Sequence, residues 1–172
     1  MVLKIPSKKL LRFSNQGGFT LVELLATSTI ALILLALAIV YFNPAERIKR
    51  ARDGKRLSDI SKIDRAISEF MLDKKYYPDT QGVLRLSTAL PEGSTSLNKS
   101  NKGWIFDNLS SYIPMLPTDP LNDDIYYYSY IRGSSGYELD AKLESMVGEM
   151  INDGGNDSLM YEVGNNLNLI SP

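Results

Sequence analysis

The stretch NQGGFTLVELLATSTIALILLALAIVYFNP, Asn15 to Pro44, places one acidic residue, Glu23, near the start of a long apolar run. As a helix rising ~1.5 Å per residue, Phe19 to Phe42 would span about 36 Å, enough for a hydrocarbon core of about 30 Å. Ile30 to Phe42 is a run of hydrophobic residues without a polar face, which disfavours the buried helix of a soluble domain. The stretch predicts a membrane-spanning helix.

Composition limits the chemistry open to this chain. It has 172 residues, 44% of them hydrophobic, and it contains neither cysteine nor histidine. Disulfides, thiol chemistry, a Ser-His-Asp triad and the usual zinc ligands are therefore excluded. The formal net charge of -1 conceals an asymmetry, since the N-terminus is basic and the segment from Asp107 onward is acidic. The length suits one modest domain attached to the apolar helix.

The order of parts before the apolar run argues against an ordinary secretory signal peptide. The basic residues of the leader are Lys4, Lys8, Lys9 and Arg12. Gly17 and Gly18 follow them, so the small residues suited to cleavage lie before the apolar run. Cleavage there would keep the helix and discard the basic leader. This arrangement, with the motif GGFTLVELL, resembles the prepilin leader of type IV pilins and type II secretion pseudopilins.

The resemblance assigns a role to each residue around the cleavage site. It implies that a dedicated prepilin peptidase cuts after Gly18 and methylates the new amino group of Phe19. Glu23 would then lie about 6 Å along the helix from that amine, at ~1.5 Å per residue. In the family the equivalent glutamate faces the amine of a neighbouring subunit, and the two charges attract strongly at low dielectric. The alternative is an acid tolerated at the membrane interface.

The family resemblance also implies a fold class and a division of the chain. The fold would be α+β, with a long N-terminal membrane-spanning helix packed on a small antiparallel sheet, the pilin fold. We expect a cleaved leader at 1–18, a transmembrane and filament-core helix at 19–43, an amphipathic continuation at 44–76 and a globular α+β head at 77–172. The continuation carries one apolar stripe at helical spacing, formed by Ile60, Ile63, Ile67 and Phe70. Pro44 and Gly54 are the points where a kink is expected.

The head region shows shorter elements. Ile125 to Arg132 and Tyr137 to Glu144 flank the sequence GSSG and predict a β-hairpin. The second run alternates apolar with charged residues, which predicts a strand with one face in water. Val83 to Leu90 is expected to form a short helix, and 91–102 a loop. The segment that follows should cover the long helix with Trp104, Ile105, Leu109, Tyr112 and Ile113.

Two oxygen-rich stretches, TDPLNDD and INDGGNDS, hold the candidate metal ligands. Clustered carboxylates on glycine-containing loops suit Ca²⁺, which takes six to eight oxygen ligands. Major pseudopilins, which the head resembles, hold calcium in a C-terminal acidic loop. The candidate ligands are Asp119, Asp123, Asp124, Asp153 and Asp157. The alternative is that these are solvated turn residues without an ion.

The resemblance implies a structural subunit and no enzyme. The subunit would polymerise with itself and other pilins or pseudopilins, after a prepilin peptidase has acted, helped by an inner-membrane platform protein and an assembly ATPase. The basic leader predicts a cytoplasmic N-terminus and a head outside the inner membrane. Secretion pseudopilus and type IV pilus both remain open, with the head favouring the former.

Two alternatives differ in function. A minor or competence pilin would bind DNA or surfaces, but the acidic C-terminal half would repel phosphates, so nucleic acid is not expected as a partner. A single-pass membrane-anchored enzyme or binding domain would use the abundant carboxylates, although no pair of them has a recognisable acid-base setting.

Overall fold

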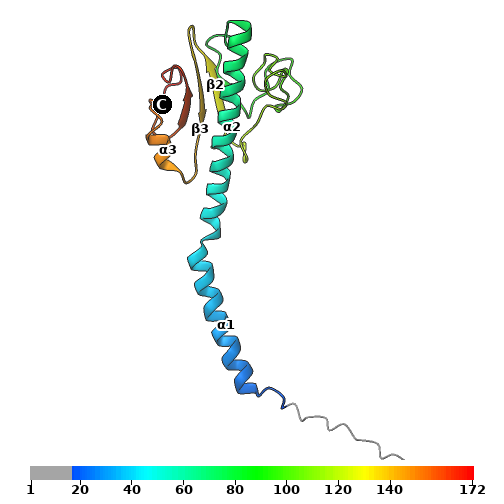
Figure 1. The fold of residues 1–172 in the computed structure, drawn as a ribbon, viewed down its shortest axis with the longest axis vertical. Coiled ribbons are helices and arrows are strands. Elements are labelled where there is room, and N and C mark those ends of the chain that lie inside the picture. The colour runs from blue at the N-terminus through cyan, green and yellow to red at the C-terminus, as the bar shows by residue number, and fades with distance from the viewer. Residues whose placement is uncertain (1–16) are drawn as a thin grey trace, which may run out of the picture. The chain divides into compact units, whose positions relative to one another are not determined.

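The computed structural model describes residues 17–172, and the chain divides into two compact units between Asn43 and Pro44. The first unit contributes helix α1 (Leu21–Phe42), and the second contains helices α2 (Pro44–Lys74) and α3 (Val147–Ile151) (Figure 1). The described residues also form a sheet of strands β1 (Arg85–Leu86), β2 (Tyr128–Arg132), β3 (Tyr137–Ala141) and β4 (Tyr161–Gly164). The α+β fold expected from the sequence is confirmed. The basic leader residues lie outside the described part.

Helix α1 begins and ends at local signals in the sequence. The hydroxyl of Thr20 caps the helix by accepting a hydrogen bond from the Glu23 N–H at 3.2 Å. Glu23 therefore lies in the first turn, where the positive end of the helix dipole favours an acid. The helix ends because Asn43 has a left-handed backbone, with φ 36°, and Pro44 then starts α2 without needing an N–H donor. The interruption expected at Pro44 is present, whereas α2 continues unbroken through Gly54.

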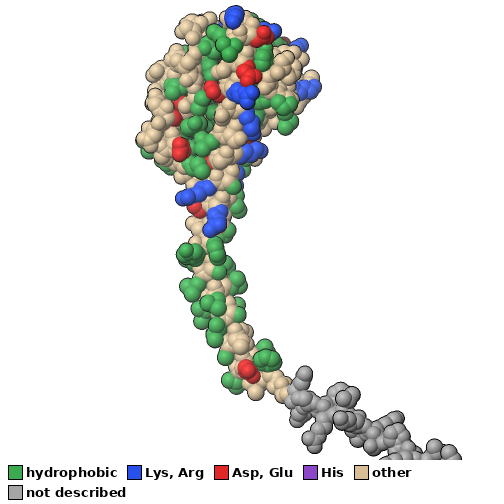
Figure 2. Space-filling model, in the orientation of Figure 1, with side chains coloured by type: hydrophobic (Ala, Val, Ile, Leu, Met, Phe, Trp, Pro, Cys, Tyr) green, Lys and Arg blue, Asp and Glu red, His purple; other side chains and the backbone are tan. Residues whose placement is uncertain are grey.

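Most side chains of α1 are apolar, and nearly all of them are exposed. None of the residues Leu21–Phe42 is buried within the described structure, and Figure 2 shows hydrophobic side chains covering this helix. By its length and hydropathy the helix could cross a membrane. A helix that is apolar all round needs lipid or other protein to cover it.

Helix α2 buries one stripe against the core of the head. The expected stripe residues are all buried: Ile60, Ile63, Ile67 and Phe70. The irregular segment after residue 102 supplies the other wall, as expected, with Trp104, Ile105, Leu109 and Ile113 buried and Tyr112 packed against them. Trp104 is anchored by a hydrogen bond from its Nε1 to the Pro117 carbonyl at 2.8 Å.

The sheet is antiparallel throughout, in the order β1-β2-β3-β4. The predicted hairpin is confirmed as β2 and β3, which meet with Arg132 opposite Tyr137. The prediction of a short helix over Val83 to Leu90 is wrong, because Arg85–Leu86 pairs with β2 instead. Ser87 extends this pairing by donating its N–H to the Tyr128 carbonyl at 2.8 Å. Hydrogen bonds to an open strand edge thus outweigh a weak local helix preference.

The expectation of a wet face on β3 is also wrong. All five residues of β3 are buried. Leu139 and its neighbours on the same face join the core under α2. On the opposite face, the Glu138 carboxylate accepts hydrogen bonds from the N–H groups of Leu169 and Ile170. The C-terminal residues therefore cover the face that the alternating pattern assigned to water.

Candidate functional site

The predicted processing site lies directly before α1. Gly17, Gly18 and Phe19 are exposed and precede the first helical residue. Nothing lies within 4 Å of the position that a Cβ would take at either glycine. Because proteases act on accessible, irregular backbone, this segment suits a peptidase, and a cut after Gly18 would leave helix α1 complete. Glu23 is exposed in the first turn of that helix.

A buried ion network joins α2 to the rest of the head. Arg56 is 0% exposed. Its guanidinium donates to both carboxylate oxygens of Asp119, at 2.6 and 3.0 Å, and to Asp53 at 2.8 Å and Glu144 at 2.7 Å. Asp53 also accepts N–H bonds from the consecutive residues Glu144–Met146. The network therefore ties the segment after β3 to the helix.

Glu144 lies between two guanidinium groups of α2. It receives hydrogen bonds from Arg52 and from Arg56. Mainly through the bond from Arg52, these contacts lower the pKa of Glu144 to about 2. Arg52 and Arg56 belong to the basic segment that follows the apolar run. In the folded head they therefore serve as internal partners for acids.

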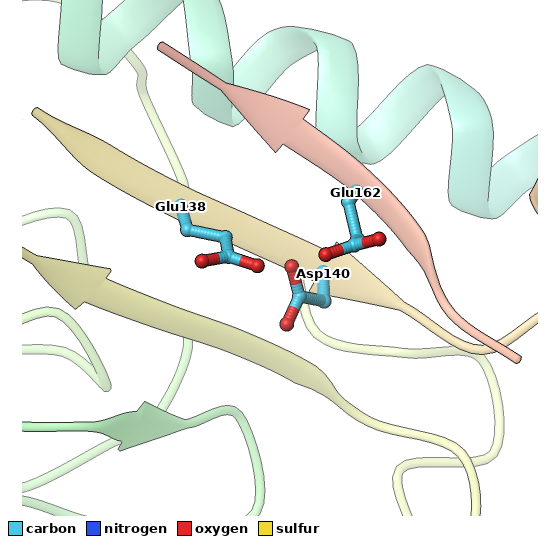
Figure 3. A group of neighbouring side chains, drawn as sticks. All are labelled: Glu138, Asp140 and Glu162. Atoms are coloured by element: carbon cyan, nitrogen blue, oxygen red, sulfur yellow. The ribbon is translucent and has the colours of Figure 1, made fainter. Parts of the chain in front are cut away.

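A cluster of three buried carboxylates lies on the face of the sheet opposite α2 (Figure 3). Within residues 17–172, Glu138, Asp140 and Glu162 are the group of three or more acids that could share a metal ion, with ligand oxygens within 4.8 Å of one another. Glu138 and Asp140 alternate along β3 and so share a face. Glu162 stands opposite Asp140 on β4. The three residues are 0%, 2% and 3% exposed, respectively.

Only part of this cluster is satisfied by the protein. Glu138 Oε2 accepts the N–H bonds of Leu169 and Ile170, at 2.6 and 2.8 Å. Asp140 Oδ2 accepts a bond from the Ser129 hydroxyl at 3.3 Å. The other oxygens, Glu138 Oε1 and Asp140 Oδ1, are buried without a hydrogen-bond partner. A buried carboxylate oxygen without a partner is costly, so these two atoms call for an explanation.

The electrostatics of the cluster follow from burial and like charge. Burial, with repulsion from Glu138 and Glu162, raises the pKa of Asp140 to about 8. Burial is also the main cause that raises the pKa of Glu138. Three carboxylates cannot all be charged in such a place without a compensating positive charge.

The structure brings two of the five predicted calcium ligands to the edge of this cluster. Asp153 Oδ2 accepts the Glu162 N–H at 2.8 Å, and the Asp157 N–H donates to Glu162 Oε2 at 2.9 Å. Gly155 lies between them, and a Cβ there would overlap the Glu162 carboxylate. The loop before β4 therefore contacts Glu162 through the Asp153 side chain and through the backbone of Gly155 and Asp157.

The other three predicted ligands have different surroundings. Asp119 uses both oxygens to bind Arg56. Asp123 Oδ1 accepts the N–H groups of Ile125 and Tyr126 and so shapes a turn, while Asp124 is exposed. The five residues do not form a set that fits one ion.

Sequence reasoning missed the three clustered acids for an identifiable reason. Alternation places Glu138 and Asp140 on one strand face, but that face was expected to be in water. The partner strand was not predicted at all, although Tyr161-Glu162 repeats the Tyr137-Glu138 pair that opens β3. This repeated pair is the signal that could have indicated two neighbouring strands.

Comparisons with known proteins agree with the leader and the fold. Residues 13–39 match the prokaryotic N-terminal methylation motif, and residues 43–159 match the type II secretion system protein G family. The type II secretion system core protein G of Pseudomonas aeruginosa is 32% identical over 113 residues, covering 66% of this chain and 73% of the relative. The Escherichia coli protein of that name is also 32% identical over 113 residues, covering 64% of this chain and 70% of the relative.

A third relative, from Vibrio cholerae, carries the same name and is 28% identical over 118 residues, covering 69% of this chain and 74% of the relative's length. No solved structure matches the chain significantly. The match to protein G includes α2 and the sheet up to the residues just before β4. With most of its length matched, the chain belongs to the type II secretion system protein G family.

Proposed function

We propose that this chain is a structural subunit of a type II secretion pseudopilus, assembled from the inner membrane after processing at Gly18. One observation carries the proposal: an exposed helix, apolar on every side, precedes a head that has its own core. Such a helix is covered either by lipid or by the same helix of other copies, which is what a subunit moving from membrane to filament requires. The protein family is structural, so the anchored-enzyme alternative is set aside.

The exposed segment directly before α1 suits the processing step. A prepilin peptidase would cut after Gly18 and methylate Phe19, both of which lie in exposed backbone outside the helix. The match to the N-terminal methylation motif supports this step. The new N-terminus, Phe19, would directly precede Thr20, which caps the helix.

Glu23 would act in assembly. Its place in the first turn is about 6 Å of helix rise from the amino group of a processed Phe19, at ~1.5 Å per residue. Placing a single charged carboxylate in an apolar environment costs free energy, and pairing it with a cation from another copy offsets that cost. Pairing Glu23 with the Phe19 amine of a neighbouring subunit would therefore fix the axial register of the filament.

The remaining partners follow from membership of a secretion system. The subunit would act with other pseudopilins, an inner-membrane platform protein and an assembly ATPase, with its N-terminus cytoplasmic and its head outside. The basic leader supports this orientation by the positive-inside rule. In the basic segment after α1, Arg52 and Arg56 are neutralised by ion pairs with Glu144 of the head.

The test is the intact mass of the full chain, expressed with and without a prepilin peptidase. Wild type and the control Gly17→Ala should lose residues 1–18 and gain one methyl group only when the peptidase is present. Gly18→Val should remain uncut, because a branched side chain replaces the residue before the cleaved bond. An uncut wild-type chain beside an active peptidase would contradict the proposal.

Assembly is tested separately on processed protein. Glu23→Gln should be cut normally and inserted in the membrane but should enter filaments poorly. Thr27→Val is the matched control, since within residues 17–172 the Thr27 hydroxyl bonds to carbonyls of its own helix, those of Glu23 and Leu24. Filaments formed equally well by Glu23→Gln would remove the charge pair from the mechanism.

A further inference from the structure

We infer that the first turns of α2 form a docking surface for the headgroups of anionic phospholipids. The surface consists of Arg47, Lys49 and Arg50, which we call the juxtamembrane cations. The inference goes beyond filament assembly. It rests on the membrane anchoring of the proposed function, which the same experiment tests by a separate signal.

The length of chain between α1 and the cations keeps them near the edge of a membrane that α1 spans. Helix α1 ends with the exposed aromatic residues Tyr41 and Phe42, and aromatic side chains are enriched where a membrane meets water. Pro44 is two residues further on and lies at most about 7 Å from Phe42. Arg50 lies about 9 Å beyond Pro44 along α2. The headgroup layer extends about 5–7 Å beyond the hydrocarbon, so Arg50 lies within roughly one Debye length, about 10 Å, of that layer.

The juxtamembrane cations are exposed and outnumber the acid beside them. All three are exposed, and Figure 2 shows Lys and Arg side chains gathered along this part of α2. Glu46 pairs with Arg50 at 3.5 Å, which leaves the Arg50 side chain 67% exposed. Glu46 also accepts a hydrogen bond from the Ser145 hydroxyl of the head. With three basic residues and one acid, residues 44–51 carry a formal net charge of +2.

The next basic residues of α2 have a different role. Arg52 and Arg56 both form ion pairs with Glu144, and the Arg56 side chain is fully buried. The fold therefore uses these two guanidinium groups inside the head. The juxtamembrane cations stay on the surface, where they can meet a partner outside the chain.

The arrangement of the cations around the helix favours a lipid surface over a protein partner. At about 100° per residue, Lys49 and Arg50 lie about 200° and 300° around the helix axis from Arg47. A docked protein would contact one side of α2 and leave some of these cations uncovered. Headgroups surround a helix where it leaves a bilayer, so they can reach cations on every side.

The chemistry of the cations selects anionic lipids among membrane lipids. Guanidinium and ammonium groups donate charge-assisted hydrogen bonds to phosphate oxygens. A lipid with a net negative charge, such as phosphatidylglycerol, should be favoured beside each cation by about fivefold over a zwitterionic lipid. Such contacts would also offset the bias against basic residues on the outer side of the membrane. They would hold the base of the head at the membrane until the subunit leaves the bilayer.

The experiment is electron paramagnetic resonance of the full chain in phosphatidylcholine vesicles that contain a trace of spin-labelled lipid. The label is on phosphatidylcholine in one sample and on phosphatidylglycerol in the other. Immobilised phosphatidylcholine reports that α1 lies in the bilayer. In wild type, phosphatidylglycerol should be preferred over phosphatidylcholine by about fivefold. Raising the salt from about 0.01 M to about 1 M shortens the Debye length from about 30 Å to about 3 Å and should abolish most of this preference.

The test variant combines Arg47→Gln, Lys49→Gln and Arg50→Gln, and should lower the preference about twofold or more. The basic leader is the same in every chain, so the difference reports the start of α2. The matched control combines Lys75→Gln, Lys99→Gln and Lys102→Gln, which removes the same charge from exposed positions at the far end of α2 and beyond it. The control should keep the wild-type preference. If the triple variant does not fold, as judged by tryptophan fluorescence, Lys49→Gln alone takes its place.

Three results would overturn the inference. An equal preference in wild type and in the test variant would do so, and immobilised phosphatidylcholine would then show that membrane anchoring still holds. An equal loss in the control would assign the effect to net charge. Wild type that immobilises neither lipid would refute the anchoring itself, and the inference with it.

Discussion

Replacement of Arg56 by methionine should destabilise the head by about 3–5 kcal/mol, the usual cost of removing one partner from a buried ion pair. Arg56 is fully buried and donates hydrogen bonds to Asp53, Asp119 and Glu144. Methionine fills much of the same volume, so the loss is one of charge and hydrogen bonding rather than packing. Domains of this size are commonly stable by about 5–15 kcal/mol, so the expected loss is a large share.

The structure also sets an upper bound on this loss of stability. The carboxylates keep some donors, since Asp53 still accepts backbone N–H bonds and Glu144 still binds Arg52. Asp119 is the most affected, because the guanidinium contacts both of its oxygens. A loss well above 5 kcal/mol is therefore not expected.

The assay is urea unfolding of the full chain in detergent, followed by tryptophan fluorescence. Arg65→Met is the matched control on the same helix, because Arg65 and its partner Glu69 are 80% and 40% exposed, and such pairs contribute about 0.5 kcal/mol or less. If Arg56→Met unfolds within 1 kcal/mol of wild type, roughly the spread of ordinary surface changes, the network does not stabilise the head and the reasoning fails.

Two further perturbations test the head. The pKa of Glu144 is lowered to about 2, so its contribution to stability is complete above the unfolded pKa of about 4.3 and is lost as pH falls towards 2. Between pH 5 and pH 3, wild type should lose about 1.6 kcal/mol more than Glu144→Gln in urea titrations. Equal losses would exclude this acid as the cause. Gly164→Ala should cost at least about 1–3 kcal/mol, because φ is 154° and a Cβ would overlap the Tyr137 carbonyl. Gly148→Ala, where nothing lies within 4 Å, should be neutral or stabilising in the same thermal melts, and a reversed order would contradict the geometry.

The two long helices, α1 and α2, were predictable from the sequence because their signals are local. Helix α1 is indicated by its own apolar run. Its two ends are indicated by residues next to them, the capping threonine and the Asn43-Pro44 pair. The stripe from Ile60 to Phe70 likewise identifies the buried face of α2 without knowledge of what covers it. The hairpin followed from two short strands separated by a glycine-bounded turn.

The sheet face and its acids were not predictable, because they depend on contacts between distant segments. Alternation in β3 shows that Glu138 shares a face with Asp140. Whether that face meets water depends on residues about 30 positions later in the chain, such as Leu169, which a local pattern does not identify. The same holds for Arg56, whose neighbours in sequence resemble an ordinary exposed basic segment. Its burial depends on Asp119 and Glu144, which no helical pattern connects with it.

Gly155 links backbone geometry to sequence change over evolution. Any other residue at this position would put a Cβ into the space occupied by the Glu162 carboxylate. A lineage that replaced the glycine would have to shorten or lose the acid, and one that lost the acid would be free to replace the glycine. Positions 155 and 162 should therefore vary together among homologous chains, and an acid at 162 should be accompanied by glycine at 155.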